Sequence, residues 1–216
     1  MKEYLTVALT KGRLVSDALS LLEKAGCAEK GIFDRNSRKL IFTDETHKMR
    51  FFLSKAQDVP TYVEAGAADL GVVGADTVLE EKRRVYEVLD LRFGACRMCV
   101  CGAPSAKKLL DARSIVRVAT KYPAIAREYF YNERQQTVDI IKLNGSVELG
   151  PMVSLSDVIV DIVETGTTLK ENGLEVLAEI CPLSARLIVN QVSMQMETER
   201  IRSLIGRLKE QVEADD

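Results

Sequence analysis

Short apolar segments and amphipathic stretches follow one another along this chain from end to end. Apolar runs of about four to eight residues are typical of strands buried in a sheet, and apolar residues at helical spacing are typical of helices that cover it. Their alternation predicts an α/β fold with parallel sheets covered by helices. The expected strands are residues 4–9, 40–43, 49–53, 70–73, 98–101, 115–119, 138–143, 158–163 and 185–189.

The helices are expected between these strands. Apolar residues recur at helical spacing from Leu14 to Ala25 and stop at Gly26, a residue suited to the left-handed end of a helix. Further helical segments are expected at residues 58–65, 104–110 and 122–134. The last helix should pack on the body of the protein or on a partner, because it carries one apolar stripe made of Ile201, Leu204, Ile205, Leu208 and Val212.

Length and composition describe an ordinary globular chain. Its 216 residues are 46% hydrophobic and 29% charged, which excludes a disordered or collagen-like protein. A formal net charge of −2 excludes a global positive field that would recruit nucleic acid or an anionic membrane. We expect two lobes, residues 1–94 with 184–216 and residues 95–183, with a ligand cleft between them.

The cysteines and the N-terminal segment indicate a cytoplasmic protein. The five cysteines are odd in number, the first residues lack a secretory signal, and no uncharged apolar run reaches the roughly 18 residues of a membrane span. Cys96, Cys99 and Cys101 raise the possibility of a metal site, but no nearby histidine completes a ligand set, which favours buried thiols. A single histidine, His47, excludes a multi-histidine site.

Residues 156–169, SDVIVDIVETGTTL, carry the strongest chemical signal. An apolar strand leads to Asp161 and Glu164 and then to Thr165, Gly166, Thr167 and Thr168 at the start of a short helix. Hydroxyls and backbone N–H groups there can surround a phosphate, Gly166 allows close approach, and the carboxylates can accept hydrogen bonds from ribose hydroxyls. The pattern favours a ribose 5-phosphate site. The alternative is a simple helix cap with two solvated acids.

Two further loops follow strands of the first lobe. Lys11, Gly12 and Arg13 come where the first strand gives way to the first helix, so the two cations can bind polyphosphate oxygens while Gly12 permits close backbone approach. Two solvated cations are the alternative. Asp69 and Asp76 are expected to belong to one glycine-flanked loop that can meet a base or a ribose, although such turns are common.

Three separated motifs, residues 11–14, 58–74 and 161–169, make the chain resemble the ATP phosphoribosyltransferase family in its short form. The resemblance covers essentially the whole chain and implies two α/β lobes like those of type II periplasmic binding proteins. It implies a pentosyltransferase that transfers phosphoribosyl from 5-phosphoribosyl 1-diphosphate to the adenine N1 of ATP with Mg²⁺, releasing diphosphate, in the first step of histidine biosynthesis.

The resemblance also implies residue roles. Lys11, Arg13 and Lys55 would act as catalytic residues on the ATP and polyphosphate side, in lobe one. The substrate-binding residues would be Gly12, Asp69, Asp76, Arg97, Asp161, Glu164, Thr165, Gly166, Thr167 and Thr168, with the phosphoribosyl diphosphate loop in lobe two. No residue is assigned as a metal ligand, because substrate phosphates would hold most of the Mg²⁺. Catalysis would need positioning and charge neutralisation rather than a covalent nucleophile.

Two positions depart from the family pattern. Lys55 stands where the family commonly has Arg, which keeps the charge but loses the bidentate fork, and Ser154 stands where the signature usually has Gly. The family's long form has a regulatory domain after the last helix, so this chain looks like the short form. It would then work with a regulatory partner that resembles the catalytic core of histidyl-tRNA synthetase, in a hetero-oligomer. A non-catalytic binding module and a phosphoribosyltransferase for another base are the alternatives.

Overall fold

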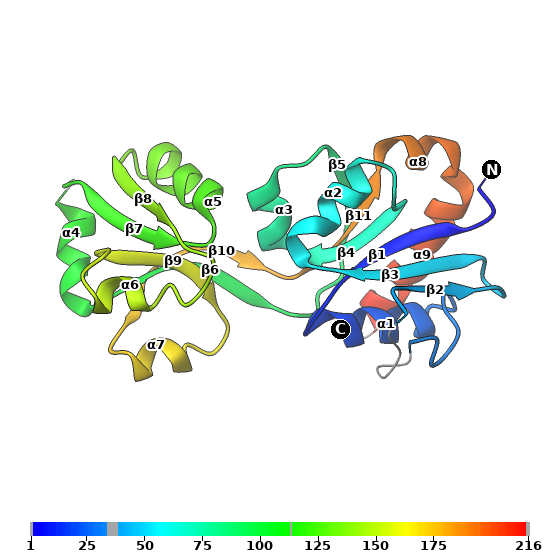
Figure 1. The fold of residues 1–216 in the computed structure, drawn as a ribbon, viewed down its shortest axis with the longest axis horizontal. Helices are drawn as coiled ribbons and strands as arrows, with labels where there is room; N and C mark the ends of the chain where they lie inside the picture. Colours follow the sequence, from blue (N-terminus) through cyan, green and yellow to red (C-terminus); the bar gives the residue numbers. More distant parts are fainter. Residues whose placement is uncertain (1, 34–38, 113, 215–216) are drawn as a thin grey trace. The chain divides into compact units, whose positions relative to one another are not determined.

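The computed structural model describes residues 2–33, 39–112 and 114–214. The chain forms two compact units, each with its own sheet (Figure 1). Unit 1 is Met1–Gly94 with Ser184–Asp216, and unit 2 is Ala95–Leu183. In the described ranges no helix is both long enough and apolar enough to cross a membrane.

Unit 1 contains a six-stranded sheet in the order β2-β3-β1-β4-β11-β5. Its strands are β1 (Leu5–Thr10), β2 (Ile41–Asp44), β3 (Met49–Ser54), β4 (Leu70–Gly74), β5 (Val85–Asp90) and β11 (Ala185–Asn190). β1 runs parallel to β3 and β4, but β2 is antiparallel to β3, and β11 is antiparallel to β4 and β5. The expectation of a purely parallel sheet is therefore wrong: β2 and β3 form a hairpin, and β11 enters the sheet in the opposite direction.

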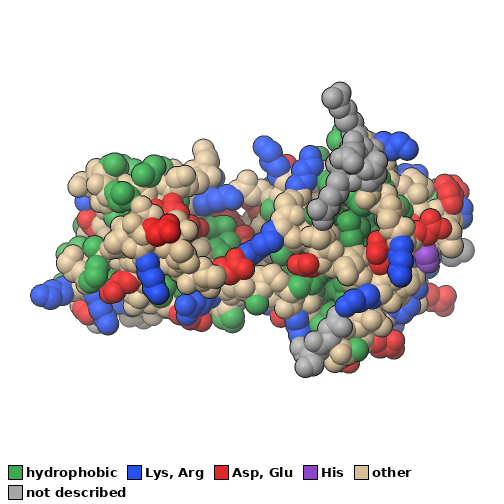
Figure 2. Space-filling model, turned by 90° about the horizontal axis from the view of Figure 1, so that it is seen from below, with side chains coloured by type: hydrophobic (Ala, Val, Ile, Leu, Met, Phe, Trp, Pro, Cys, Tyr) green, Lys and Arg blue, Asp and Glu red, His purple; other side chains and the backbone are tan. Residues whose placement is uncertain are grey.

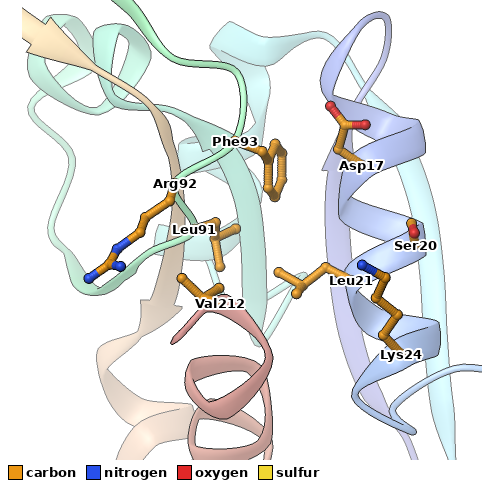
Figure 3. A pocket seen from close by; sticks show the side chains of 8 residues that line it. All are labelled: Asp17, Ser20, Leu21, Lys24, Leu91, Arg92, Phe93 and Val212. Carbon is orange, nitrogen blue, oxygen red and sulfur yellow. The ribbon is translucent and has the colours of Figure 1, made fainter. Parts of the chain in front are cut away.

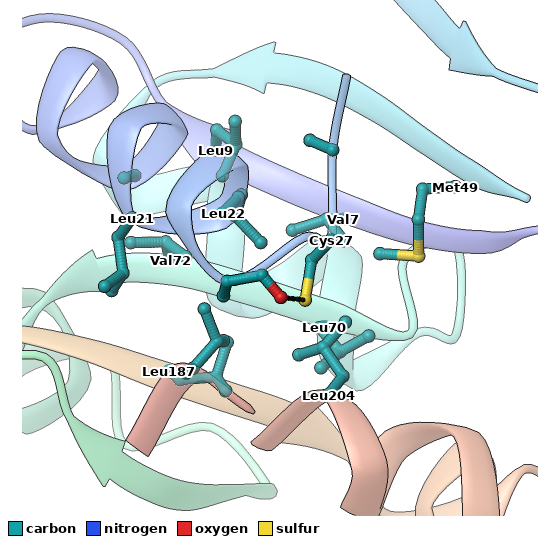
Figure 4. Packing of buried hydrophobic residues seen from close by; sticks show 14 of the residues in the cluster. Val7, Leu9, Leu21, Leu22, Cys27, Met49, Leu70, Val72, Leu187 and Leu204 are labelled. Carbon is teal, nitrogen blue, oxygen red and sulfur yellow. Dashed lines mark hydrogen bonds between the residues drawn. The ribbon is translucent and has the colours of Figure 1, made fainter. Parts of the chain in front are cut away.

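The main core of unit 1 lies between one face of this sheet and two helices, α1 (Leu14–Lys24) and α9 (Thr198–Ala214). Figure 4 shows Leu21, Leu22 and Leu204 meeting strand residues there. The expected stripe of α9 packs on this core, with Ile201 and Leu208 almost fully buried. α1 ends as the sequence predicts, since Gly26 has φ +61° and Cys27 N donates to Leu22 O at 2.8 Å.

Shorter helices complete unit 1. They are η1 (Ala56–Asp58), α2 (Val59–Glu64), α3 (Ala75–Glu81) and α8 (Gln191–Met196). Val59 and Val63 of α2 pack with Ala8, Val73 and Ile188 in a second apolar cluster. Neighbouring residues in a strand point to opposite faces, so this cluster covers the face opposite the main core.

Unit 2 contains a five-stranded sheet in the order β10-β6-β9-β7-β8. Its strands are β6 (Cys96–Gly102), β7 (Val116–Thr120), β8 (Val138–Lys142), β9 (Val158–Val163) and β10 (Glu175–Leu183). β7 is parallel to β8 and β9, whereas β6 is antiparallel to β9 and β10, so this sheet is mixed as well. The helical segments are η2 (Pro104–Ala106), α4 (Lys107–Asp111), α5 (Pro123–Arg127), the π-helical η3 (Glu128–Glu133), α6 (Leu149–Met152) and α7 (Thr167–Glu171).

Every strand expected from the sequence is present, and the predicted α/β class is confirmed. The sequence did not predict β5 or β10, each of which lies at one edge of its sheet. Both have partly exposed residues along their length, and β10 also contains Pro182, a residue tolerated only at a sheet edge. The segment expected as one helix at 122–134 is a short α-helix that continues into a π-helix.

Candidate active site

Two lysines leave the sheet of unit 1 side by side at its carboxyl edge, meaning the edge where the parallel strands β1, β3 and β4 end. Thr10 of β1 lies opposite Ser54 of β3, and Lys11 N donates to Ser54 O at 2.8 Å. Lys11 and Lys55 are the next residues of the two strands, and both are exposed. The register therefore brings together two cations that are distant in the sequence.

Gly12 turns the chain from β1 into α1. Its φ of +107° belongs to the region that side chains other than glycine rarely adopt. Arg13, the N-cap residue of α1, follows at once and is exposed. Because the turn is this short, Arg13 stays at the same edge of the sheet as Lys11.

Asp76 joins this edge from β4, the other neighbour of β1. It lies in the first turn of α3, and Thr77 Oγ1 donates to its Oδ2 at 3.4 Å. A Cβ atom on Gly74 would collide with Asp76 Oδ1. Gly74 therefore allows the carboxylate to fold back over the end of β4.

Asp69 lies at the opposite end of β4. It is fully buried and accepts hydrogen bonds from Lys2 Nζ at 2.7 Å, Thr6 N at 2.8 Å and Ser193 Oγ at 2.6 Å. The expectation that Asp69 and Asp76 share one loop is wrong, because the residues between them include the strand itself. The position and contacts of Asp69 are those of a structural residue that ties the N-terminal segment to α8.

In unit 2 the predicted phosphate loop follows β9 directly. The strand ends at Val163, Gly166 has φ +77°, and α7 begins at Thr167. Thr165 Oγ1 and Thr167 Oγ1 are 3.0 Å apart, and Thr167 N donates to Thr165 Oγ1 at 3.4 Å. Thr165, Thr167 and Thr168 are exposed, while Leu169 is anchored in the core. The threonine hydroxyls of this loop are therefore presented to solvent from a fixed base.

The two acids flank the end of the same strand. Asp161 is half-buried in β9 opposite Cys99 of β6, and Glu164 is exposed in the loop. Burial, with a smaller contribution from the charge of Asp161, raises the pKa of the Cys101 thiol to about 12, and burial also raises the pKa of Cys99. Cys99 and Cys101 are thus protonated at neutral pH and buried, as predicted, whereas Cys96 and Cys181 are half-buried.

Arg97 lies beside this loop on β6, opposite Val163. Its Nη1 is 3.0 Å from Glu179 Oε2 of β10, so its charge is partly balanced by that carboxylate. Each carboxyl edge thus gathers predicted site residues from one unit. Unit 1 brings together Lys11, Gly12, Arg13, Lys55 and Asp76, and unit 2 brings together Arg97, Asp161, Glu164, Thr165, Gly166, Thr167 and Thr168.

The sequence analysis did not single out Lys121, which is the first residue after β7. β7 is the parallel neighbour of β9, so Lys121 lies at the same edge as the phosphate loop. Its only signal in the sequence was its position at the end of an apolar segment. Recognising it requires knowing that β7 and β9 are adjacent.

A pocket elsewhere in unit 1 contains none of the predicted site residues. It has a volume of about 280 Å³ and lies between α1, residues 91–93 and the end of α9 (Figure 3). Leu21, Leu91, Phe93 and Val212 form its apolar part. On the face of the molecule shown in Figure 2, basic and acidic side chains are interspersed, in keeping with the small net charge.

The carboxylates at the two carboxyl edges are too few to bind Mg²⁺ by themselves, and they suit it only where substrate phosphates supply the other ligands. Within the described ranges, no three His, Cys, Asp or Glu side chains gather as a possible metal site. Mg²⁺ is commonly held by one or two carboxylates together with substrate phosphates and water. The acidic residues at the two edges fit that arrangement and do not form a complete protein cage.

Comparisons with known proteins identify the family of this chain. The family model "HisG: ATP phosphoribosyltransferase" matches residues 55–210. An ATP phosphoribosyltransferase of Lachnoclostridium phytofermentans is 66% identical over 208 residues, which are 96% of this chain and 97% of that protein. One from Lachnospira eligens is 61% identical over 210 residues, 97% of each chain.

A solved structure extends the match to the fold. The ATP phosphoribosyl transferase (HisG:HisZ) complex from Thermotoga maritima contains a chain with a TM-score of 0.79 and 36% identity, and the match covers 97% of this chain and 99% of that one. The predicted type II periplasmic-binding-protein fold is confirmed. With this agreement in sequence and structure, the chain belongs to the ATP phosphoribosyltransferase family.

Proposed function

We propose that this chain transfers the phosphoribosyl group of 5-phosphoribosyl 1-diphosphate to N1 of the adenine of ATP, the first step of histidine biosynthesis. Family membership supports the reaction. The observation that carries the residue assignment is the loop after β9, where exposed threonine hydroxyls follow two carboxylates. This combination suits a sugar phosphate better than a bare anion, because the carboxylates would repel phosphate but accept hydrogen bonds from ribose hydroxyls.

In this proposal the loop binds the 5-phosphate. Thr165, Thr167 and Thr168 donate hydroxyl hydrogen bonds, and the first-turn N–H groups of α7, which have no partners within the helix, donate further ones. Asp161 and Glu164 accept hydrogen bonds from the ribose hydroxyls. Together these contacts fix the ribose so that its C1 atom can be attacked in one orientation.

The chemistry needs charge neutralisation more than a nucleophilic side chain. The bond between C1 and the diphosphate oxygen breaks, the ribose gains oxocarbenium character, and the electron pair of adenine N1 forms the new bond to C1. Lys11, Arg13 and Lys55 bind phosphate oxygens and stabilise the negative charge of the departing diphosphate. Lys55 does so as a point charge without the planar fork of arginine. Substrate phosphates would hold most of the Mg²⁺, Asp161 or Glu164 would add an oxygen ligand, and the ion would supply further charge neutralisation.

We also propose that the chain works in a hetero-oligomer with a regulatory subunit that resembles the catalytic core of histidyl-tRNA synthetase. The Thermotoga maritima neighbour, a HisG:HisZ complex, supports an assembly of two kinds of subunit. The partner's role would be regulation, since the residues proposed for chemistry all belong to this chain.

The direct test is formation of phosphoribosyl-ATP, followed by ultraviolet absorbance, with Mg²⁺, ATP and phosphoribosyl diphosphate. The purified chain is assayed alone and with a synthetase-like partner. We expect turnover that requires both substrates. Folded protein that binds phosphoribosyl diphosphate but uses another base in place of ATP would point to a different phosphoribosyltransferase. A chain that neither turns over nor binds it would favour a non-catalytic module.

Variants in the loop test the residue assignment. Glu164→Gln and Thr168→Val should each raise KM for phosphoribosyl diphosphate by about tenfold, roughly 1.4 kcal/mol, with KM for ATP unchanged. Thr137→Val is the matched control, because Thr137 is an exposed threonine just before β8, at the opposite edge of the same sheet. Full activity of both loop variants at limiting substrate would refute the assignment.

A further inference from the structure

Each unit has a buried threonine at the end of a strand that leads to its carboxyl edge. Thr10 is the last residue of β1 in unit 1, and Thr120 is the last residue of β7 in unit 2. A buried hydroxyl needs a hydrogen-bond partner. In both units that partner is a backbone carbonyl of the neighbouring parallel strand, so the two threonines do the same thing in two different sheets.

In unit 2 the Thr120 hydroxyl lies where the pairing of β7 with β9 stops. Thr120 and Val160 are the last paired residues of these strands, and Thr120 Oγ1 donates to Val160 O at 2.7 Å. The same oxygen accepts from Tyr122 N at 2.8 Å, and Thr120 O accepts from Leu143 N at 2.9 Å. The hydroxyl therefore holds β9 at the residue directly before Asp161.

The Thr10 hydroxyl makes the corresponding contact in unit 1. Leu9 and Val72 are the last paired residues of β1 and β4, and Thr10 Oγ1 donates to Val72 O at 3.0 Å. Thr10 directly precedes Lys11, and β4 is followed by the helix that carries Asp76. This hydroxyl therefore ties the strand that ends before one proposed site residue to the strand that leads to another.

These contacts lie where small displacements matter for binding. Backbone hydrogen bonds hold the paired parts of the strands, but the residues after the last pair depend on other contacts for their position. Binding groups must be held to within about 0.5 Å of the productive geometry. A side chain of the same shape without the hydroxyl would fill the same space and still release the strand ends.

We propose that Thr10 and Thr120 are positioning residues. Thr120 holds the end of β9 that leads to the ribose 5-phosphate loop, and Thr10 holds the end of β1, with Lys11, against β4. Each acts through the site residues that follow it rather than by touching substrate. The inference rests on the proposed function, because the roles of those site residues are assigned there.

The test compares variants of the full chain with and without each hydroxyl. Thr120→Val and Thr10→Val remove the hydroxyl and keep the shape of the side chain, whereas Thr120→Ser and Thr10→Ser keep the hydroxyl. Steady-state kinetics give kcat and KM for both substrates, and isothermal titration calorimetry gives Kd for phosphoribosyl diphosphate. Circular dichroism melting checks that each variant is folded, with alanine as the substitute where valine is not tolerated.

Thr198→Val is the matched control. Thr198 Oγ1 donates to Met194 O and Gln195 O, each at 2.8 Å, so this variant also loses hydrogen bonds from a threonine hydroxyl to the backbone. The contact joins the start of α9 to α8. Because α8 follows β11, which runs antiparallel to β4, it lies at the edge of the sheet opposite Lys11.

We expect Thr120→Val to raise KM and Kd for phosphoribosyl diphosphate about fivefold with KM for ATP unchanged, and Thr10→Val to lower kcat about fivefold. Both serine variants should stay within about twofold of the wild type, because the hydroxyl contact is kept. Thr198→Val should lower Tm without changing kcat or KM.

Three results would overturn the inference and leave the proposed function intact. They are wild-type kinetics in the folded variants that lack a hydroxyl, serine variants as impaired as their valine counterparts, and the same kinetic changes in Thr198→Val, which would mean that lost stability causes them. If the wild-type chain neither binds phosphoribosyl diphosphate nor forms phosphoribosyl-ATP, the proposed function fails, and this inference fails with it.

Discussion

The two sheets present opposite chemistry at comparable edges. In unit 1, Lys11 and Lys55 directly follow β1 and β3, so the edge is dominated by positive charge. In unit 2, β9 ends between Asp161 and Glu164 and continues into a loop of threonines, so the edge is dominated by carboxylates and hydroxyls. Parallel strands that end together bring short loops together in both cases, but the residues on those loops differ.

This difference suits ligand groups of different chemistry at the two edges. Diphosphate and triphosphate groups carry dense negative charge and call for lysine and arginine, whereas a ribose needs hydrogen-bond acceptors with a phosphate cup beside it. One architecture can therefore serve two recognition tasks by changing a few residues after its strands. The comparison predicts that variants at the two edges fail in different ways.

The largest effect is expected at the positive edge. Lys11→Met removes a charge-assisted contact to phosphate oxygens and should lower kcat/KM by about 100-fold, roughly 2.7 kcal/mol, with a fall in kcat. Lys24→Met, further along α1, is the control and should keep wild-type kinetics. Variants of the phosphate loop are expected to change only KM for phosphoribosyl diphosphate. If Lys11→Met did the same, the proposal that the two edges have different roles would be wrong.

The next largest effect distinguishes the acids at the two ends of β4: Asp69 should matter for stability and Asp76 for kinetics. Asp69→Ala leaves the amide of Thr6 and the hydroxyl of Ser193 without their acceptor in a buried place, so the free energy of unfolding should fall by about 2 kcal/mol. Urea unfolding measures this loss. The folded fraction should keep its kcat and KM, whereas Asp76→Ala should alter kinetics with little loss of stability. An altered KM in folded Asp69→Ala would mean that Asp69 is a substrate-binding residue after all.

A smaller effect is expected on the pH dependence of the free energy of unfolding, which can be compared between the two units. Burial alone would raise the pKa of Asp44, but hydrogen bonds from His47 N, Glu29 N and the His47 ring outweigh it and hold the pKa below its usual value. A lowered pKa stabilises the fold above about pH 4 and loses that contribution as the pH falls through the folded-state pKa. Asp44→Asn should therefore cost unit 1 about 1 kcal/mol at pH 6, with the difference from wild type vanishing toward pH 2.

The matched variant for this acid effect lies in unit 2. The Arg117 side chain donates hydrogen bonds to Asp157 and lowers the pKa of that carboxyl. Urea unfolding at several pH values, with probes in each unit, should show Asp157→Asn changing the pH dependence of unit 2 and Asp44→Asn that of unit 1. An equal shift in both probes by either variant would mean that the units unfold as one.

The smallest effect concerns a backbone position outside both edges. Ser154 has φ +59°, and its carbonyl accepts a hydrogen bond from Arg117 Nη1 at 2.9 Å. Glycine adopts this conformation without steric cost, so Ser154→Gly should raise the free energy of unfolding by about 0.5 kcal/mol, while Ser154→Val should lower it. Kinetic constants should not change. A destabilised Ser154→Gly would mean that its greater unfolded-state entropy outweighs the relief of strain.

The sequence predicted the loop of unit 2 better than that of unit 1. Residues 158–163 form a continuous apolar strand with a helix start close behind, so local pattern alone located Asp161 and Glu164 correctly at its end. Around β4 an acid flanks the apolar segment on each side, and local pattern could not tell which acid lies at the same edge of the sheet as Lys11 and Lys55. That distinction depends on strand direction within the sheet, which is a tertiary property.

The remaining differences between the sequence predictions and the structure depend on the order and direction of the strands. Lys121 resembles any solvated lysine until β7 is known to lie beside β9. The antiparallel strands β2, β6 and β11 look like the parallel ones in the sequence, because a short apolar run does not specify its direction. The edge strands β5 and β10 bury too little to give a clear apolar signal.

The position of β11 between β4 and β5 has a consequence for the order of folding. β5 precedes unit 2 in the chain, but the strand next to it in the sheet, β11, follows unit 2. During synthesis β5 must wait without its partner until residues 185–190 have left the ribosome, whereas unit 2 is continuous and can form as soon as it is complete. The sheet with the positive edge is therefore finished last, and only when both ends of unit 1 have met.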